Sequence, residues 1–545
     1  MQPKLVKRCL AALIMHACCQ FAKFPLYHEE DQARVLYECN HVQIMALSQV
    51  GKAIFHTSRN HSVHAAAMVK HVLAQGQVRV RDLLLQFSAH EDTQDQDTSA
   101  AALEHRIIKL LHERYFVFAH PRDHIIAAER EREVRDKAKL DAKKNLSDAK
   151  LKQQIEEKVS AIMHRRERED NDKIDALYST AVGLSSLDGS DHGPARKRVK
   201  MDNGSAATSL LDGDAIVRFN FDKLGVLART RDLVSLCALC CGDETARIYG
   251  RLLDTLQLKT ASCRQRGKLR VPITERHIAR AIPDDMDLDD AWCTPPKSSR
   301  VAQNKRFEPH VAHTGYESDE IMSDEERSDE SDMDEAGPEP SVHSKRILAI
   351  LTGSHVPFVS QLTSTSYEID FELLGEVLRE RQVEALVSQQ LGPTAVRLLR
   401  IIKEKRKVDE KQLYAIALLQ HKDIRQALTS LHQLGVLELQ EVPKRLDRQP
   451  SLTLFFWFHK PEKAAMTLAS ELCLAMARIH QRLEALLKDK SRLLAKSKRT
   501  DVRHREAELM SPAELRDLKG VYAMQERLLC QCARAYQAYQ SLVQY

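Results

Sequence analysis

Residues 393–442 read PTAVRLLRIIKEKRKVDEKQLYAIALLQHKDIRQALTSLHQLGVLELQEV, and this stretch decides the fold. Apolar residues recur every three to four positions in three successive segments, which is the period of an amphipathic helix. We expect three helices, over residues 393–404, 409–419 and 422–434. Gly435 follows the last of them, as glycine commonly does at a helix C-terminus. A strand over residues 436–442, a turn over residues 443–450 and a second strand over residues 451–458 are expected next. Three helices followed by a two-stranded wing make a complete winged helix.

The same order of elements recurs toward the N-terminus. Residues 4–17 have the pattern of an amphipathic helix, and a hairpin over residues 19–38 follows it, which together form the second half of a winged helix. A third module is expected to open with the alternating segment 216–221. The C-terminal part repeats apolar residues at three- and four-residue steps, which predicts an antiparallel helical hairpin of the coiled-coil type.

We therefore expect seven segments along the chain. They are a truncated winged helix with a connecting helix (1–58), a second winged helix (59–126), a charged, solvent-exposed extended helix (127–183), a disordered linker (184–213), a third winged helix with a disordered acidic insertion at about 283–342 (214–380), a fourth winged helix (381–460) and a coiled-coil hairpin (461–545).

The composition agrees with a mainly helical protein that carries small β-wings. Of 545 residues 43% are apolar, which is enough for several cores and excludes a fully disordered chain. Only 18 Gly and 17 Pro are present, fewer than sandwiches, barrels or doubly wound sheets need for their turns. No apolar run reaches the roughly 20 residues of a membrane helix, so we expect neither a membrane anchor nor a signal peptide.

Charge is unevenly distributed. The net charge is +5, but residues 317–335 hold 11 acidic residues and one basic one, so the rest of the chain carries about +15. Ser323 and Ser331 each have an acidic residue three positions later, a pattern that acidophilic kinases favour, and we predict phosphorylation there. The plainer interpretation is a solubilising loop.

A basic run lies in the linker between the second and third modules. Its predicted import-signal residues are Pro194, Arg196, Lys197, Arg198, Lys200 and Asp202. Regularly spaced Lys and Arg in an extended segment suit the grooves of nuclear import receptors, so we expect a nuclear protein. A solvated charge run that keeps the linker open is the alternative.

Motifs for catalysis are missing from the sequence. It contains no glycine-rich phosphate loop, no His-Glu-x-x-His helix and no nucleophile elbow, so we predict no catalytic residues and no cofactor. The best metal candidate is the segment 237–241, with Cys237, Cys240 and Cys241, but a zinc site needs about four ligands. These cysteines occupy the apolar face of an expected helix, so we interpret them as core thiols and predict no metal.

Basic residues on the modules are candidates for nucleic-acid contact, because phosphate contact requires only positive charge on a surface. The candidates are Lys4, Lys7, Arg8, Lys403, Lys405, Arg406, Lys407, Lys444, Arg445 and Arg448. For any one of them a solvated surface role is equally compatible with the sequence. A stripe for a partner helix is predicted on the hairpin, at Leu468, Leu472, Ile479, Leu483 and Leu486.

The repeated winged helices and the hairpin resemble the family of the third subunit of RNA polymerase III, a member of its initiation heterotrimer that is itself similar to the alpha subunit of TFIIE. The most specific matches lie in the fourth module, at residues 391–394, Arg397, 409–413, 422–423 and 439–443. Weaker matches lie in the first expected helix and at residues 217–222. Family members have more sequence before the first helix, so we expect either a truncated gene model or a real loss there.

The resemblance implies a non-catalytic polymerase subunit that docks on the clamp side of the RNA polymerase III core. Its implied partners are the two smaller heterotrimer subunits, TFIIIB and melted, single-stranded promoter DNA at tRNA and other small RNA genes. No membrane and no cofactor are implied.

Two other classes of protein compete with this interpretation. A scaffold subunit of the proteasome-lid or signalosome type would place one winged helix after stacked helical pairs, with none in the interior. A sequence-specific transcription factor would need a strongly basic recognition helix, whereas residues 422–427 are only mildly charged. The recurrence of the winged-helix order favours the polymerase subunit.

Overall fold

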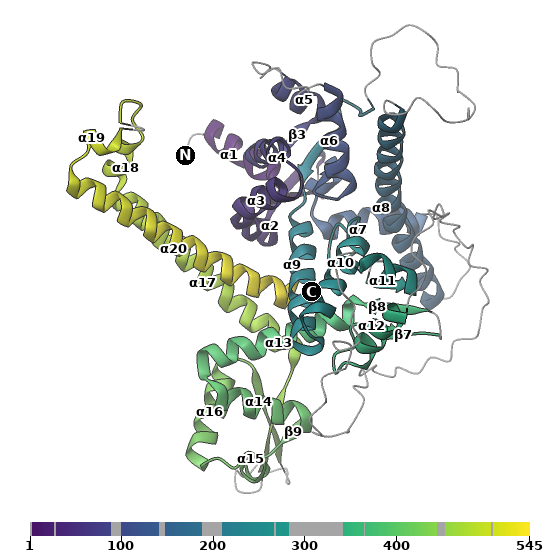
Figure 1. The fold of residues 1–545 in the computed structure, drawn as a ribbon, viewed down its shortest axis with the longest axis vertical. Coiled ribbons are helices and arrows are strands. Elements are labelled where there is room, and N and C mark those ends of the chain that lie inside the picture. Colours follow the sequence, from purple (N-terminus) through teal and green to yellow (C-terminus); the bar gives the residue numbers. More distant parts are fainter. Residues whose placement is uncertain are drawn as a thin grey trace. The chain divides into compact units, whose positions relative to one another are not determined.

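The computed structural model describes residues 3–26, 29–88, 100–140, 148–187, 210–265, 269–282, 342–363, 366–443, 453–502 and 505–545 (Figure 1). The chain divides into two compact units. The first comprises Met1–Arg229, Leu258–Gln265 and Arg379–Tyr545, and the second comprises Thr230–Gln257 and Arg266–Leu378. As expected, the protein is mainly α-helical with small antiparallel sheets. No helix in the described part of the chain is long and apolar enough to span a bilayer.

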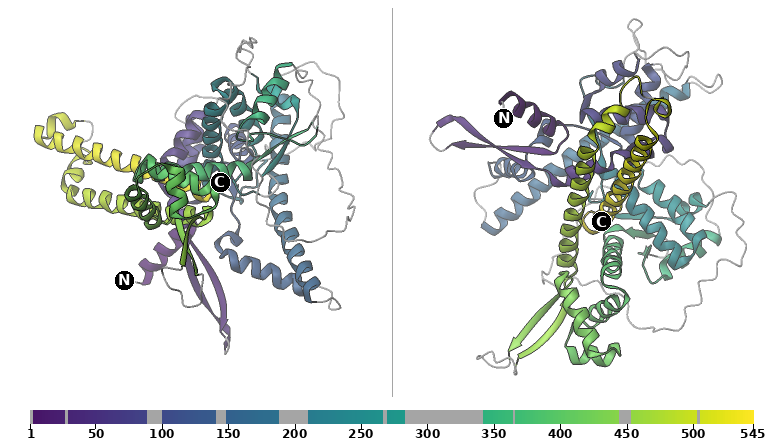
Figure 2. Two further views of the ribbon diagram at one scale, coloured as in Figure 1. Left: turned by 90° about the horizontal axis from the view of Figure 1, so that it is seen from below. Right: turned by 90° about the vertical axis from the view of Figure 1, so that its left-hand side faces the viewer.

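The N-terminal region is a helix followed by a two-stranded hairpin. Its elements are α1 (Pro3–Met15), β1 (Cys19–Leu26), β2 (Glu29–Cys39), α2 (His41–Ala46), η1 (Leu47–Gln49) and α3 (Val50–Asn60). Strands β1 and β2 are antiparallel, with Cys19 opposite Cys39, and they form the long ribbon seen in Figure 2. This is the helix-and-wing order predicted for residues 1–58.

The second module has the helix and strand order of a complete winged helix. Its elements are α4 (Val63–Gln75), β3 (Gln77–Arg79), α5 (Val80–Ser88), α6 (Ala100–His112), β4 (Phe116–Phe118) and β5 (Ile216–Phe219). The sheet order is β3-β5-β4, so β5 is the central strand. Val217 is fully buried and lies opposite both Val78 and Phe118.

The position of β5 corrects the expectation that residues 216–221 open the third module. A central strand satisfies backbone groups on both of its edges, and β3 and β4 lack a partner without it. The boundary expected at residue 214 is therefore wrong, because the second module closes only at Phe219.

Two charged helices lie in the sequence between β4 and β5. They are α7 (Ala127–Leu140) and α8 (Asp148–Leu187), preceded by η3 (Pro121–His124). We expected residues 127–183 to be exposed to solvent, but Val134, Ala138 and Ile174 are buried. In addition, the ring of Tyr178 in α8 stacks on the ring of His112 in α6, with the two ring centroids 3.8 Å apart. One face of these helices is therefore core, which their high overall charge concealed.

The second unit contains the third winged helix. Its elements are α10 (Asp243–Leu256), β6 (Arg270–Ile273), α11 (Glu275–Ala281), α12 (Val342–Gly353), β7 (Ser360–Gln361) and β8 (Tyr367–Asp370). The sheet order β6-β8-β7 again places the last strand in the centre. Tyr249 and Phe358, both fully buried, pack edge to face with their ring centroids 5.5 Å apart.

The fourth module is the winged helix predicted from residues 393–458. Its elements are α14 (Pro393–Lys405), β9 (Lys407–Val408), α15 (Glu410–Ala417), α16 (His421–Gln433), β10 (Leu437–Pro443) and β11 (Thr453–His459). Helix α14 buries Ala395, Leu398, Leu399 and Ile402, which are spaced three or four residues apart. Gly435 follows α16 with φ of +75°, and a side chain there would meet Thr467 at 2.7 Å, so this position requires glycine.

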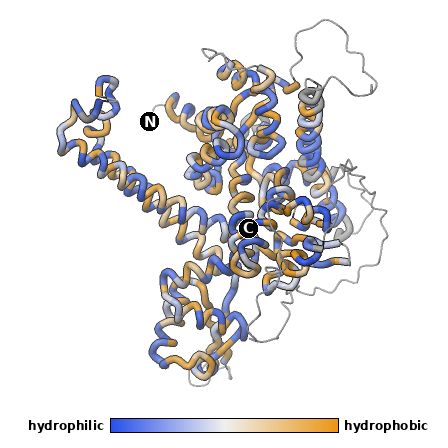
Figure 3. The backbone as a smooth tube through the Cα atoms, viewed as in Figure 1, coloured by the Kyte–Doolittle hydropathy of each residue, from blue (hydrophilic) through white to orange (hydrophobic). Residues whose placement is uncertain are grey.

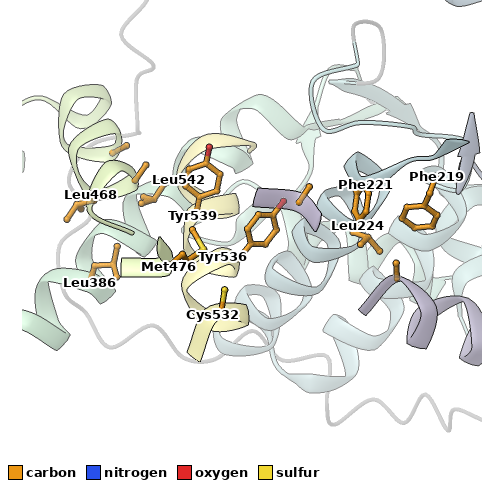
Figure 4. Packing of buried hydrophobic residues seen from close by; sticks show 14 of the residues in the cluster. Phe219, Phe221, Leu224, Leu386, Leu468, Met476, Cys532, Tyr536, Tyr539 and Leu542 are labelled. Atoms are coloured by element: carbon orange, nitrogen blue, oxygen red, sulfur yellow. The ribbon is translucent and has the colours of Figure 1, made fainter. Parts of the chain in front are cut away.

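The C-terminal region is a helical hairpin. Its elements are α17 (Pro461–Asp489), α18 (Ser491–Ser497), α19 (Glu506–Leu509) and α20 (Pro512–Val543), and α17 and α20 lie side by side in both views of Figure 2. Apolar residues recur along both helices (Figure 3). Figure 4 shows Met476 of α17 beside Tyr536 of α20, within one buried cluster.

Two long helices that connect successive modules are a structural repeat, which was not among the sequence-based predictions. Helices α9 (Phe221–Cys241) and α13 (Phe371–Leu391) both have 21 residues, and each follows the last strand of a sheet. Each ends at a glycine with positive φ, Gly242 at +92° and Gly392 at +84°, from which the next helix starts. The two copies align without gaps at a constant offset of 150 residues. The identical pairs are Phe221 and Phe371, Leu224 and Leu374, Gly225 and Gly375, Arg229 and Arg379, Arg231 and Arg381, Leu236 and Leu386, Gly242 and Gly392, and Arg247 and Arg397.

Candidate nucleic-acid and partner interfaces

The fourth winged helix presents its basic residues around the end of α14. Strand β9 leads directly into α15, which begins with a capping box, in which the Asp409 side chain accepts a hydrogen bond from Gln412 N at 2.7 Å. Strand β9 pairs with β11 at Val408 and Lys407. Of the predicted nucleic-acid residues, Lys403 and Lys405 lie in the last turn of α14, Arg406 caps this helix, and Lys407 lies in β9.

Lys403 does not fit its predicted role. Its ammonium group is 3.2 Å from Glu380 Oε2 and 3.2 Å from Glu384 Oε1, and its side chain is only 17% exposed. Burial alone would raise the pKa of Glu384, but hydrogen bonds from Arg400 and Lys403 lower it. Two carboxylates already neutralise Lys403, so we correct the prediction that it contacts nucleic acid.

The next three basic residues are exposed. Lys405 Nζ lies 3.5 Å from Glu404 Oε1, and a surface ion pair of this kind contributes little to stability. Arg406 terminates α14 with φ of +67°, and the ammonium group of Lys407 lies 5.9 Å from the Phe458 ring centroid. Their positive charges are therefore accessible to a phosphate backbone.

Lys4, Lys7 and Arg8 are exposed on α1. Among the residues that the structure describes, none of the three has an ion-pair partner. They remain predicted contacts for nucleic acid.

Several predicted site residues lie outside the described residues. These are Lys444, Arg445 and Arg448 of the fourth wing, Ser323 and Ser331 of the acidic insertion, and the import-signal residues Pro194, Arg196, Lys197, Arg198, Lys200 and Asp202.

The stripe predicted for a partner helix instead packs within the chain. Leu468 is 1% exposed, and Leu472 and Ile479 join it in the buried cluster that includes residues of α20. Leu486 packs on a second cluster near the hairpin tip, and Leu483 is half-buried. Most of the apolar surface that we assigned to a partner is therefore covered by the second helix of the hairpin.

The cysteine segment of α9 contains one buried and two half-buried thiols. Cys237 is buried, while Cys240 and Cys241 are half-buried. Hydrogen bonds from the side chains of Cys237 and Ser354 lower the pKa of Cys241 to about 7, against the effect of burial. Within the described ranges, His, Cys, Asp and Glu side chains form no group of three that could hold a metal ion.

A groove that the sequence analysis missed lies between α13 and α14. It has a volume of about 830 Å³, and its lining includes Arg381, Arg397 and Arg400 together with the apolar Val396 and Ile416. The 150-residue repeat is the sequence signal that could have drawn attention to it, because two of these arginines belong to the identical pairs.

Taken together, these elements define a tandem winged-helix protein with exposed basic residues on its first helix and fourth module. The family described as RNA polymerase III subunit RPC82 matches residues 105–378, half of the chain. The C-terminal winged-helix domain described for POLR3C matches residues 383–459. The chain belongs to the RNA polymerase III subunit RPC82 family.

Fungal relatives agree with this assignment. The DNA-directed RNA polymerase III subunit RPC3 of Yarrowia lipolytica is 31% identical over 59% of this chain and 55% of the relative. The corresponding subunit of Aspergillus niger is 30% identical over 58% of this chain and 51% of the relative. The chain spans about half the length of the curated relatives it matches.

Proposed function

We propose that the chain is a non-catalytic peripheral subunit of RNA polymerase III that acts in transcription initiation. The observation that carries the proposal is the pair of family matches, which extend from residue 105 in the second module through the third and fourth winged helices, together with the exposed basic residues at the end of α14. Winged helices present a helix and a wing on a rigid core, so several in tandem offer separate faces for protein and for DNA.

The proposed partners are the clamp side of the polymerase core, two smaller subunits of the initiation heterotrimer, TFIIIB, and melted promoter DNA. Exposed Lys and Arg side chains hold single strands through their phosphates without reading sequence, which suits a role in opening many different promoters. This role places the protein in the nucleus and requires no catalytic group of its own.

An extract depleted of the endogenous subunit tests this role. Transcription from a closed duplex tRNA-gene template is expected to fall and to recover when the recombinant chain is added with its two small partners. A template with a pre-melted start region should depend less on the addition, because opening is no longer required. Equal loss of transcription from a promoter-independent tailed template would contradict the proposal, since it would assign the chain to RNA synthesis itself.

A further inference from the structure

We propose that the groove between α13 and α14 binds an acidic amphipathic segment of a partner protein. This inference goes beyond the role in initiation and does not depend on DNA binding. It rests on the lining of the groove and on a comparison with the equivalent helix pair α9–α10 of the second unit.

The two helix pairs are held together differently. In α9–α10, Gly250 lies so close to Val234 that an added Cβ would be 3.2 Å from its Cγ2 atom. The repeat places Arg400 and Glu384 at these two positions, and their side chains pair at 2.8 Å. In α13–α14, two long, ion-paired side chains therefore replace the close apolar packing of α9–α10. The groove lies between α13 and α14.

The arginines of the groove also differ in their pairing. In the second unit, Arg231 lies 3.6 Å from Asp232 and Arg247 lies 3.3 Å from Glu244. The repeat replaces these two carboxylates by Gln382 and Thr394. Over the described ranges, the equivalent Arg381 and Arg397 consequently have no ion-pair partner, although both are exposed and line the groove. Two unpaired guanidinium groups favour a ligand that supplies carboxylates.

The groove also offers apolar contacts. Ala385, Val396, Ile401 and Ile416 line it, and Ile416 is 42% exposed. Two residues further on, Leu418 is 82% exposed and has φ of +53°, a conformation that is unfavourable for a leucine. An amphipathic segment buries such side chains while its carboxylates reach the arginines.

A protein partner explains the groove better than nucleic acid does. Glu384 and Glu404 also line it, and they would repel a continuous phosphate backbone. A peptide places its few carboxylates beside Arg381 and Arg397 and its apolar residues on the floor, so it avoids both glutamates.

The test is site-specific photo-crosslinking in the purified polymerase complex that contains the full chain. A benzophenone amino acid replaces Ser388, which is exposed and lines the groove. The crosslinked peptide is then sequenced by mass spectrometry. We expect a segment of another subunit in which Asp or Glu residues flank apolar residues at helical spacing.

Charge reversal supplies the second measurement. The double variant Arg381→Glu/Arg397→Glu is expected to lower the crosslink yield by about tenfold, the loss that corresponds to two modest ion pairs. The matched control is Arg231→Glu/Arg247→Glu at the equivalent positions of the repeat, which should leave the yield unchanged. Circular dichroism establishes that both variants are folded.

Each remaining outcome overturns the proposal. A crosslink to DNA would assign the groove to nucleic acid, and a crosslink to residues 317–335 would show that the acidic stretch of this chain occupies it. No crosslink, or equal losses in both double variants, would mean that no acidic partner binds there. Recovery of the other polymerase subunits in the same preparation keeps these outcomes separate from a failure of the proposed function.

Discussion

Glu384 joins α13 to α14 by binding Arg400 and Lys403 at once. The change Glu384→Gln removes the charge that compensates both cations and is expected to destabilise the fourth module by about 1–3 kcal/mol at pH 7. Urea unfolding followed by Trp457 fluorescence measures this loss. The chain has two tryptophans, so both proteins are compared with Trp292→Phe in place, which leaves Trp457 as the only tryptophan that fluoresces.

The effect of Glu384→Gln on stability is also expected to depend on pH. The pKa of Glu384 is lowered in the folded protein, so its stabilising contribution is present above the ordinary glutamate pKa of about 4.3. It is lost as the pH falls through the lowered value, and the difference between wild type and variant should therefore shrink below about pH 4. Glu404→Gln, on the exposed side of α14, is the control and should change stability by less than about 0.5 kcal/mol.

Residue-level roles were only partly predictable from the sequence. The basic character of residues 403–407 is readable directly, but the neutralisation of Lys403 depends on carboxylates 19 and 23 residues earlier. No local pattern reports a pairing across two helices. Lys405, two residues further on, has similar chemistry and remains exposed.

Among the elements, the hairpin gives the clearest stability prediction. Leu468→Ala in α17 removes a 1% exposed side chain from the cluster shared with α20 and is expected to cost about 2–5 kcal/mol. Leu474→Ala on the same helix is the control, because Leu474 is 50% exposed. Thermal unfolding should separate the two variants, and equal effects would show that α17 and α20 are not packed as described.

The end of α14 gives a prediction about nucleic acid. Replacing Lys405, Arg406 and Lys407 by glutamine is expected to weaken binding to single-stranded DNA and to reduce the slope of log K against log salt by up to about 2. Anisotropy titrations of a labelled oligonucleotide at several salt concentrations measure this slope. Lys403→Gln is the control and should leave the slope unchanged, and an equal effect of both variants would return Lys403 to the binding surface.

Elements with local signals were predicted well, and pairings distant in sequence were not. The helices of the fourth module follow from the spacing of their apolar residues, and Gly435 marks where the third one ends. Strand β5 alternates as a strand should, but α7 and α8 separate it in sequence from β4, so its partners could not be read from its neighbours. The buried face of α8 was hidden for another reason, because a long helix can be highly charged overall and still bury a narrow stripe.

At the scale of the whole molecule, winged-helix order recurs along the chain, and the family match extends over its central half. This recurrence argues against a lid-type scaffold, which would have a single terminal winged helix. We therefore propose that the chain works as part of RNA polymerase III.

Affinity purification tests this claim most directly. The N-terminally tagged chain is recovered from nuclear extract at moderate salt, because charged contacts weaken as ionic strength rises, and the co-purifying proteins are identified by mass spectrometry. We predict recovery of the RNA polymerase III core together with two smaller subunits in comparable amounts. Recovery of a lid-like assembly, or of no polymerase subunit at all, would contradict the account.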